Sequence, residues 1–201
     1  MERNRPRDKR LERGEQTRRR ILRETIAMIA EDGIKEVSAA KLAKATSVSK
    51  SNIFHHFHSI DEIRMHALYI IFDDLLGQLD AEYRDLDDFL QSLGRSFFQL
   101  PEDHLKTVRA FFSYYHEGMF DSEYQKALAS CADQMAVRLS KHLTQLTPHP
   151  VPQETVESIA TILLSTMDGM GLHYLLTGEG ARFKQAWQLQ VQMIYQLLSE
   201  Q

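Results

Sequence analysis

Apolar residues along this 201-residue chain recur at steps of three and four, the spacing that gathers side chains on one face of an α-helix. The pattern predicts a first helix from Thr17, its N-cap, to about Asp32. Gly33 follows as a residue suited to a left-handed helix end, because glycine has no Cβ to oppose that backbone. No segment alternates apolar and polar residues convincingly as a strand would, so the pattern favours an all-α protein.

Two short helices are expected next, joined by a tight turn. Ser38 is placed to cap the first, over 39–45, and Ser49 to cap the second, in which Ile53 and Phe57 point inward. Three helices within about forty residues, the last two joined by a three-residue turn, are typical of a helix-turn-helix.

The rest of the chain continues the helical pattern. A fourth helix, expected over 60–83, is apolar on two faces, which predicts that it packs against two neighbours. Apolar stripes between residues 86 and 146 predict three more helices. A proline-rich loop over 147–153 then precedes two final helices, 154–177 and 181–198. The prediction is about nine helices in all.

The net charge of −4 conceals two oppositely charged parts of the chain. Residues 1–58 hold 14 Lys and Arg against 8 Asp and Glu, a net charge of +6, whereas residues 59–201 hold 10 against 20, a net charge of −10. A basic segment ahead of an acidic body indicates either a nucleic-acid module joined to something else or a solubilising tail. Charge alone does not choose between these two interpretations.

Composition narrows the class of protein further. The single cysteine excludes an intramolecular disulfide framework, and its place on an apolar stripe predicts that Cys131 is buried and inert. No stretch has the roughly 18 uncharged apolar residues of a membrane span. The charged N-terminus offers no apolar signal segment. We therefore expect a cytoplasmic protein without a membrane partner.

Candidate catalytic and metal-binding residues are sparse. His55, His56 and His58 are dense in sequence, but neighbours along a helix point in different directions and chelate poorly. Glu62 and His66 lie four residues apart with no evident third ligand. The chain also lacks a phosphate-binding glycine loop, a nucleophile elbow and the paired Glu-x-x-His motifs of a helical di-iron enzyme. We expect no enzyme activity, no cofactor and no metal.

The order of these elements resembles the TetR family of bacterial transcriptional regulators. The matching residues are Thr17-Arg18-x-x-Ile21-Leu22, Glu31-Asp32-Gly33, Leu42-Ala43 and the run from Val48 to Phe57. Beyond about residue 66, only the number, lengths and order of the helices agree. We accordingly expect a flexible basic arm over 1–16, a helix-turn-helix DNA-binding domain over 17–58, and a helical ligand-binding and dimerisation domain over 59–201.

Four positions depart from the family's usual pattern. Ser47 and Ser51 stand where members usually have glycine, and Phe54 stands where a tyrosine commonly donates to a phosphate. Ile60 replaces a lysine that commonly meets the DNA backbone. The resemblance of fold survives these changes, but the phosphate contacts at Phe54 and Ile60 do not carry over.

The resemblance implies a homodimer whose third helices enter successive major grooves of double-stranded DNA, on half-sites of a palindromic operator roughly 34–36 Å apart. Lys50 and Asn52 carry most of the expected base readout, because Lys donates to guanine and Asn pairs with adenine. Phosphate contacts would fix the register without reading sequence. The expected base-edge residues are Lys50, Ser51, Asn52 and His55, and the expected phosphate contacts are Arg18, Ser38, Lys41 and His56.

The resemblance also implies a ligand pocket and a dimer interface in the acidic body. The expected pocket residues are Phe72, Phe97, Phe112, Tyr115, Met119, Met135, Met167 and Asp168. Apart from Asp168 these suit a hydrophobic ligand, although for any single one of them ordinary core packing is the favoured interpretation. Asp168 is either the counter-charge of a cationic ligand or a carboxylate that neighbouring donors satisfy. The expected interface residues are Ile159, Ile162, Leu163, Thr166, Met170, Leu189, Met193, Ile194 and Leu197.

Together these expectations describe a repressor that leaves its operator when a small hydrophobic molecule binds the second domain. The fourth helix, which touches both domains, would transmit the change. Two alternatives remain open: a DNA-binding regulator with a filled core that responds to a protein partner or to nothing, and, with less support, a helical enzyme.

Overall fold

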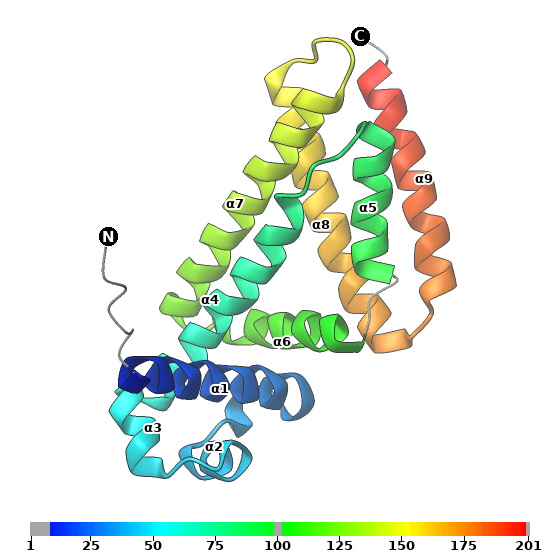
Figure 1. The fold of residues 1–201 in the computed structure, drawn as a ribbon. Coiled ribbons are helices and arrows are strands. Elements are labelled where there is room, and N and C mark those ends of the chain that lie inside the picture. Colours follow the sequence, from blue (N-terminus) through cyan, green and yellow to red (C-terminus); the bar gives the residue numbers. More distant parts are fainter. Residues whose placement is uncertain (1–8, 99–101, 200–201) are drawn as a thin grey trace, which may run out of the picture.

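The computed structural model describes residues 9–98 and 102–199, and in these ranges the regular structure is helical, with no strand (Figure 1). The described part holds nine α-helices and one short 3-10 helix, η1 (Ile34–Glu36), which confirms the all-helical prediction. The bounds of the α-helices are α1 Lys9–Asp32, α2 Ala39–Thr46, α3 Lys50–His56, α4 Ile60–Leu79, α5 Leu86–Phe98, α6 Glu102–Gly118, α7 Ser122–Leu146, α8 Gln153–Thr177 and α9 Gly180–Ser199.

The start of α1 corrects one prediction. The helix begins at Lys9, so Thr17 lies in its interior and donates its hydroxyl to the backbone oxygen of Arg13 at 2.9 Å instead of capping the helix. Residues 9–16 contain no proline that would interrupt a helix. The Glu15 carboxylate lies 3.7 Å from the Arg19 guanidinium one turn further on, an ion pair that favours the helical conformation. Residues 9–16 are therefore helical rather than a flexible arm, and the rest of the expected arm lies outside the described residues.

Serine caps start α2, α3 and α4, and those of α2 and α3 confirm the predictions for Ser38 and Ser49. The hydroxyls of Ser38, Ser49 and Ser59 accept the backbone N–H three residues on, at 3.3, 3.1 and 3.0 Å. Each bond satisfies one of the N–H groups that a helix start leaves without a partner. The three caps fix the directions in which the helix-turn-helix and the helix that supports it leave their turns.

Two backbone positions between these helices have positive φ. Gly33 has φ 91° and ψ 161°, so it ends α1 with the positive φ that only glycine adopts readily, but outside the left-handed helical region that the sequence suggested. Ser47, at the end of α2, adopts the left-handed helical conformation with φ 54°. Ser47 therefore holds a backbone conformation that glycine adopts more readily than serine.

The first domain rests on α4 and α6. In Figure 1, α1 lies beside α6 at the foot of the second domain, and α4 rises from the helix-turn-helix to run beside α7. The Tyr114 hydroxyl of α6 donates to the backbone oxygen of Arg64 at 2.7 Å, and the Arg64 guanidinium donates to the backbone oxygen of Val37 at 3.0 Å. Lys35 also pairs with Glu117 at 3.5 Å. As predicted, α4 packs on both domains.

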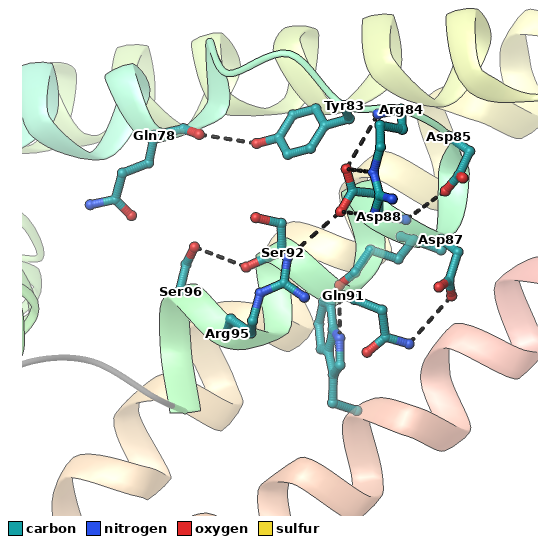
Figure 2. Close-up of polar contacts among 12 residues, drawn as sticks. Gln78, Tyr83, Arg84, Asp85, Asp87, Asp88, Gln91, Ser92, Arg95 and Ser96 are labelled. Carbon is teal, nitrogen blue, oxygen red and sulfur yellow. Dashed lines mark hydrogen bonds and ion pairs between the residues drawn. The ribbon is translucent and has the colours of Figure 1, made fainter.

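A polar network orients α5 in the second domain. Figure 2 shows Arg84 against Asp88, with guanidinium nitrogens 3.2 Å from both carboxylate oxygens, and Arg95 3.8 Å from the same carboxylate. On the side facing α9, the Trp187 indole donates to the backbone oxygen of Leu90 at 3.0 Å. A Cβ on Gly94 would lie 2.5 Å from that indole, so glycine is required for α5 and α9 to approach this closely.

One described helix, α8, is long and apolar enough to cross a membrane by length and composition alone. It does not contain 18 consecutive uncharged residues, because Glu157 and Asp168 interrupt it. Such a helix is weak evidence for a membrane protein, because the core helix of a soluble protein passes the same test. Here α8 packs against α5, α6, α7 and α9, and Ile159, Leu163 and Met167 lie in the core.

Candidate DNA-binding face and effector site

The outer face of α3 carries all four residues predicted to meet base edges. Lys50, Ser51, Asn52 and His55 are exposed, because Ile53 and Phe57, at 0% and 1% exposure, anchor the opposite face in the core. Lys50 forms no ion pair with a described residue. An exposed lysine and an exposed amide within one turn of the helix cap form a face that can donate to and accept from base edges.

The Arg18 side chain is engaged with groups of its own chain, whereas a predicted phosphate contact is expected to be exposed and unpaired. Its guanidinium donates to the backbone oxygen of His56 at 2.8 Å and to Nε2 of His66 at 2.9 Å, and its Cζ lies 4.2 Å from the centre of the Phe57 ring. Because a guanidinium has only donors, Nε2 of His66 is the acceptor of this hydrogen bond. These internal contacts do not support a phosphate contact at Arg18, which stays a prediction. We call Arg18, His56, Phe57 and His66 the Arg18 clamp.

The clamp ties three helices together. Arg18 belongs to α1, the backbone oxygen it binds ends α3, and His66 lies in the second turn of α4. The His56 ring is half-buried, and burial, with smaller contributions from His55 and Arg18, lowers its pKa. A neutral ring attracts a phosphate less than a charged one, so His56 is a weaker phosphate contact than the sequence suggested.

The other two predicted phosphate contacts are already engaged within the chain. The Ser38 hydroxyl caps α2, and the Lys41 ammonium forms an ion pair with Glu36 and lies 3.8 Å from Asp32. The Lys41 side chain is exposed, and its hydrogen bond with Glu36 raises its pKa. A DNA phosphate would have to exchange with a carboxylate to reach it, although exposed pairs of this kind contribute little stability.

The sequence interpretation missed a basic face on α1. Arg13, Arg20 and Arg23 are exposed and form no ion pair with a described residue, and together with Arg19 they border a shallow hollow of about 640 Å³. The run of arginines was visible in the sequence. Only the earlier start of α1 places residues 13, 20 and 23 on one helix, at spacings of seven and three.

In the second domain, a carboxylate and a tyrosine meet between two helices. The Tyr115 hydroxyl of α6 donates to Oδ2 of Asp168 on α8 at 2.6 Å. Asp168 is half-buried and lies within salt-bridge distance of no described cation. Burial raises the pKa of Asp168, and the Tyr115 hydrogen bond opposes this increase. The structure thus brings together two of the predicted pocket residues.

Aromatic rings extend from this pair towards α4. The Tyr115 ring lies 5.2 Å from Phe111 and 5.4 Å from Phe112, and Phe72 lies 6.2 Å from Phe111. Tyr69 continues the series 6.3 Å from Phe72. Phe72 and Phe112 were predicted as pocket residues, whereas Tyr69 and Phe111 were not.

The remaining pocket predictions divide into three groups. Met135 and Met167 are 5% and 2% exposed and belong to the packed core. Met119 lies beyond the end of α6 and is 69% exposed, and its role in a pocket stays a prediction. The Phe97 side chain lies outside the described residues.

Burial also divides the predicted interface residues. Ile159, Leu163 and Ile194 are at most 3% exposed and pack in the chain's own core, so their assignment to a dimer interface is wrong. The predicted residues that are half-buried are Thr166 and Met170, and those that are exposed are Ile162, Leu189, Met193 and Leu197. The last three lie at steps of four, as a stripe along α9.

The described residues include no group of three or more His, Cys, Asp or Glu side chains placed to hold a metal. Cys131 is 2% exposed, as predicted. Burial and the nearby charge of Asp168 raise the pKa of the Cys131 thiol to about 12. Because the thiolate is the reactive form, this cysteine is inert at neutral pH.

Comparisons with known proteins agree with the geometry of the first domain. Residues 21–65 match the sequence family described as bacterial regulatory proteins, tetR family. No curated protein matches the chain by sequence. The matched segment runs from the middle of α1 into α4 and includes the whole of α2 and α3.

Solved structures with the same fold cover nearly the whole chain. A transcriptional regulator from Rhodococcus sp. Rha1 is 24% identical, with 89% of this chain and 96% of that chain aligned and a TM-score of 0.75. A TetR transcriptional regulator from Legionella pneumophila is 18% identical, over 87% and 95% of the two chains, with a TM-score of 0.70.

A third similar structure was determined with a ligand. This protein from Saccharomonospora viridis, in complex with choline, is 21% identical, over 87% of this chain and 94% of that chain, with a TM-score of 0.66. Residues 21–65 therefore match the amino-terminal domain of the tetR family of bacterial regulatory proteins, and the chain as a whole shares the fold of these solved transcriptional regulators.

Proposed function

We propose that this DNA-binding regulator acts as a homodimer on a palindromic operator and is released when a small molecule binds its second domain. The observation that carries the proposal is the outer face of α3, where Lys50 and Asn52 are exposed above a rigidly anchored helix. Two such helices, one from each protomer, would enter major grooves roughly 34–36 Å apart.

Lys50 and Asn52 are the proposed readers of sequence, with Ser51 and His55 beside them. Phosphates would be held by the basic face of α1 and by Ser38 and Lys41 after exchange of their internal partners. This division follows the usual one, in which phosphate contacts set the register and contacts to base edges select the site.

The exposed apolar residues of α8 and α9 support the homodimer. Leu189, Met193 and Leu197 form a continuous stripe, and Ile162 lies exposed on the neighbouring helix, which contacts α9. A contiguous apolar face of this kind is typical of a protein–protein interface. Burying it in a symmetric pair of protomers would hold the two recognition helices at a fixed spacing.

The Tyr115–Asp168 pair and its aromatic neighbours support a small-molecule site. The choline complex of the Saccharomonospora viridis protein makes a ligand in this fold a reasonable expectation for our chain. An effector that binds one shape of the dimer better than another by about 1.4 kcal/mol is sufficient for a tenfold release of DNA.

The burial of Met135 and Met167 favours a second candidate function. In this alternative the second domain has a filled core, and the regulator responds to a protein partner or to nothing. The two candidates differ in whether a small molecule binds the purified protein and lowers its affinity for DNA.

Selection of bound fragments from a genomic library, followed by fluorescence anisotropy on the selected site, tests the DNA-binding half of the proposal. The double variant Lys50→Ala, Asn52→Ala should lose about 1–3 kcal/mol of discrimination at the base pairs it reads, because each good contact to a base edge contributes that much. Lys141→Ala, an exposed charge change on α7, is the matched control. An unchanged sequence preference in the double variant would refute the assignment of the readers.

A further inference from the structure

Phe54 is a large apolar residue that the fold leaves exposed on α3. It is 45% exposed, whereas Ile53 and Phe57 on the same helix are 0% and 1% exposed. Phe54 is not among the apolar residues that form the core or pack against it. Its ring stacks on no aromatic ring or cation of the described residues. Packing within the chain therefore gives the Phe54 ring no role.

The position of Phe54 along α3 gives the ring a candidate role. Single exposed apolar side chains are common on protein surfaces, so exposure alone assigns nothing. Phe54 lies four residues after Lys50 and three after Ser51, and this spacing puts the three exposed side chains on one strip of the helix. Helical side chains lean towards the preceding turn, which here is the turn that carries Lys50 and Ser51. The ring therefore belongs to the face proposed to meet base edges.

The chemistry of the phenyl ring restricts what it can contact on DNA. Phosphates are held by side chains that donate hydrogen bonds, and phenylalanine has no donor and no acceptor. It is equally unable to bond to the polar atoms of a base edge. The apolar group that base pairs present in the major groove is the 5-methyl group of thymine, and phenylalanine is one of the side chains that contact it. A phenyl ring on a helix in the major groove is therefore suited to distinguish thymine from the other bases.

The helix that carries Phe54 is held at both ends. The Ser49 hydroxyl caps its start by accepting a backbone N–H at 3.1 Å, and the Arg18 guanidinium donates to the backbone oxygen of His56 at its end, at 2.8 Å. Because the backbone of α3 is already ordered, placing the ring against a base requires little further ordering of the chain.

We propose that Phe54 is a specificity-determining residue of the DNA-binding face, whose ring packs against the 5-methyl group of a thymine in each half-site of the operator. This inference rests on the proposed function, in which α3 enters the major groove, and it adds an apolar reader to the polar readers Lys50 and Asn52. The polar readers select donors and acceptors on base edges, and the ring selects a methyl group. Uracil pairs as thymine does but lacks this methyl, so the contact can be removed without changing a hydrogen-bonding group of the DNA.

Operators in which deoxyuridine replaces thymidine test the proposal. Fluorescence anisotropy measures binding of the full-length protein to the selected operator and to copies in which one thymidine of a half-site, or its symmetry-related pair, is exchanged. At the thymine that Phe54 contacts, loss of the methyl group should weaken binding about fourfold per half-site, the fold-change that corresponds to about 0.8 kcal/mol for one buried methyl group. At thymines that α3 does not reach, the same exchange should leave the affinity unchanged.

Variants assign the effect to the ring. The measured quantity is the ratio of the affinities for the thymine and uracil operators, in which a general loss of affinity cancels. Phe54→Ala should bring this ratio close to one, and Phe54→Leu, which keeps an apolar side chain, should retain part of it. Phe120→Ala removes an exposed phenylalanine from the turn between α6 and α7 and, as the matched control, should keep the ratio of the wild type. Circular dichroism establishes that each variant is folded.

The outcomes separate this inference from the proposed function. The inference is overturned if no thymine responds to loss of its methyl group, if the ratio is the same in Phe54→Ala as in the wild type, or if the selected half-sites contain no thymine. An equal loss of affinity for both operators in Phe54→Ala, with a wild-type ratio of one, would indicate a contact with deoxyribose and would overturn it as well. None of these results affects the proposed function, which the sequence preference of the Lys50 and Asn52 double variant decides independently.

Discussion

Two half-buried charged residues of this protein, Arg18 in the first domain and Asp168 in the second, differ in how far neighbouring groups compensate their charge. Arg18 donates to a backbone oxygen and to a histidine and lies over an aromatic ring. Asp168 has the Tyr115 hydroxyl as its described partner. One charge is compensated by its own chain, and the other is compensated only in part.

This difference separates a structural residue from a candidate binding residue. A buried or half-buried charge with all its partners in place stabilises one conformation and has little left to offer a ligand. A charge with unused hydrogen-bonding capacity lowers the stability of the free chain. A ligand that completes its hydrogen bonds can restore that stability. From sequence, both residues were candidates for binding, and only their surroundings distinguish them.

The largest expected effect comes from removing the compensated charge. Arg18→Ala should lower the free energy of unfolding by about 2–4 kcal/mol, because hydrogen bonds to a charged group contribute about 1.5–3 kcal/mol and a cation over a ring about 0.5–2 kcal/mol. Urea denaturation followed by circular dichroism measures the change. Arg20→Ala, an exposed arginine on the same helix, is the control and should stay within about 0.5 kcal/mol of wild type. Equal effects of the two changes would mean that the clamp contributes nothing.

A smaller effect of opposite sign is expected at Asp168. Its pKa is raised in the folded chain above the ordinary 3.8, so the folded state binds a proton more readily than the unfolded state. The contribution of Asp168 to stability is therefore fully present below the ordinary pKa and is lost as the pH rises through the raised one. Asp168→Asn should be more stable than wild type at neutral pH, and this gain should disappear as the pH falls towards 3.8.

Unfolding in urea at a series of pH values measures that dependence. Asp133→Asn, on the exposed side of α7, controls for a general effect of net charge. A gain that is the same at every pH, or a loss at neutral pH, would show that burial does not raise the pKa of Asp168.

The smallest expected change in stability comes from substitutions on the basic face of α1. These substitutions should change DNA binding instead. Arg20→Ala should lower the slope of log affinity against log salt concentration by about one, because one phosphate contact is lost. Lys184→Ala, on α9, should leave the slope as in wild type. Fluorescence anisotropy over a salt series measures both, and identical slopes for the two variants would remove α1 from the interface.

Local features of the fold were predictable from sequence, whereas features that depend on distant residues were not. The serine caps at Ser38, Ser49 and Ser59 depend on a backbone group three residues away, so the sequence shows both partners. Arg18 reads as an exposed cation at a helix start because its partners His56 and His66 lie 38 and 48 residues further on. Nothing in the spacing connects them.

The apolar pattern was also unable to separate inward from outward faces on α8 and α9. Each helix has apolar residues on more than one side, and the prediction placed the buried Ile159 and Leu163 in the same interface as the exposed Ile162. Periodicity identifies apolar faces, but only the positions of α5 and α7 decide which face the chain itself covers.

Tyr114 and Tyr115 are consecutive residues of α6, yet their hydroxyls reach different helices, α4 at Arg64 and α8 at Asp168. Because adjacent side chains on a helix diverge by about 100°, the two bonds leave α6 in different directions while sharing one rigid backbone segment. A rotation of α6 that relieves one bond must therefore displace the other. The path from Asp168 on α8 to Arg64 on α4 therefore consists of two hydrogen bonds, the two tyrosine side chains and the single peptide unit that joins them.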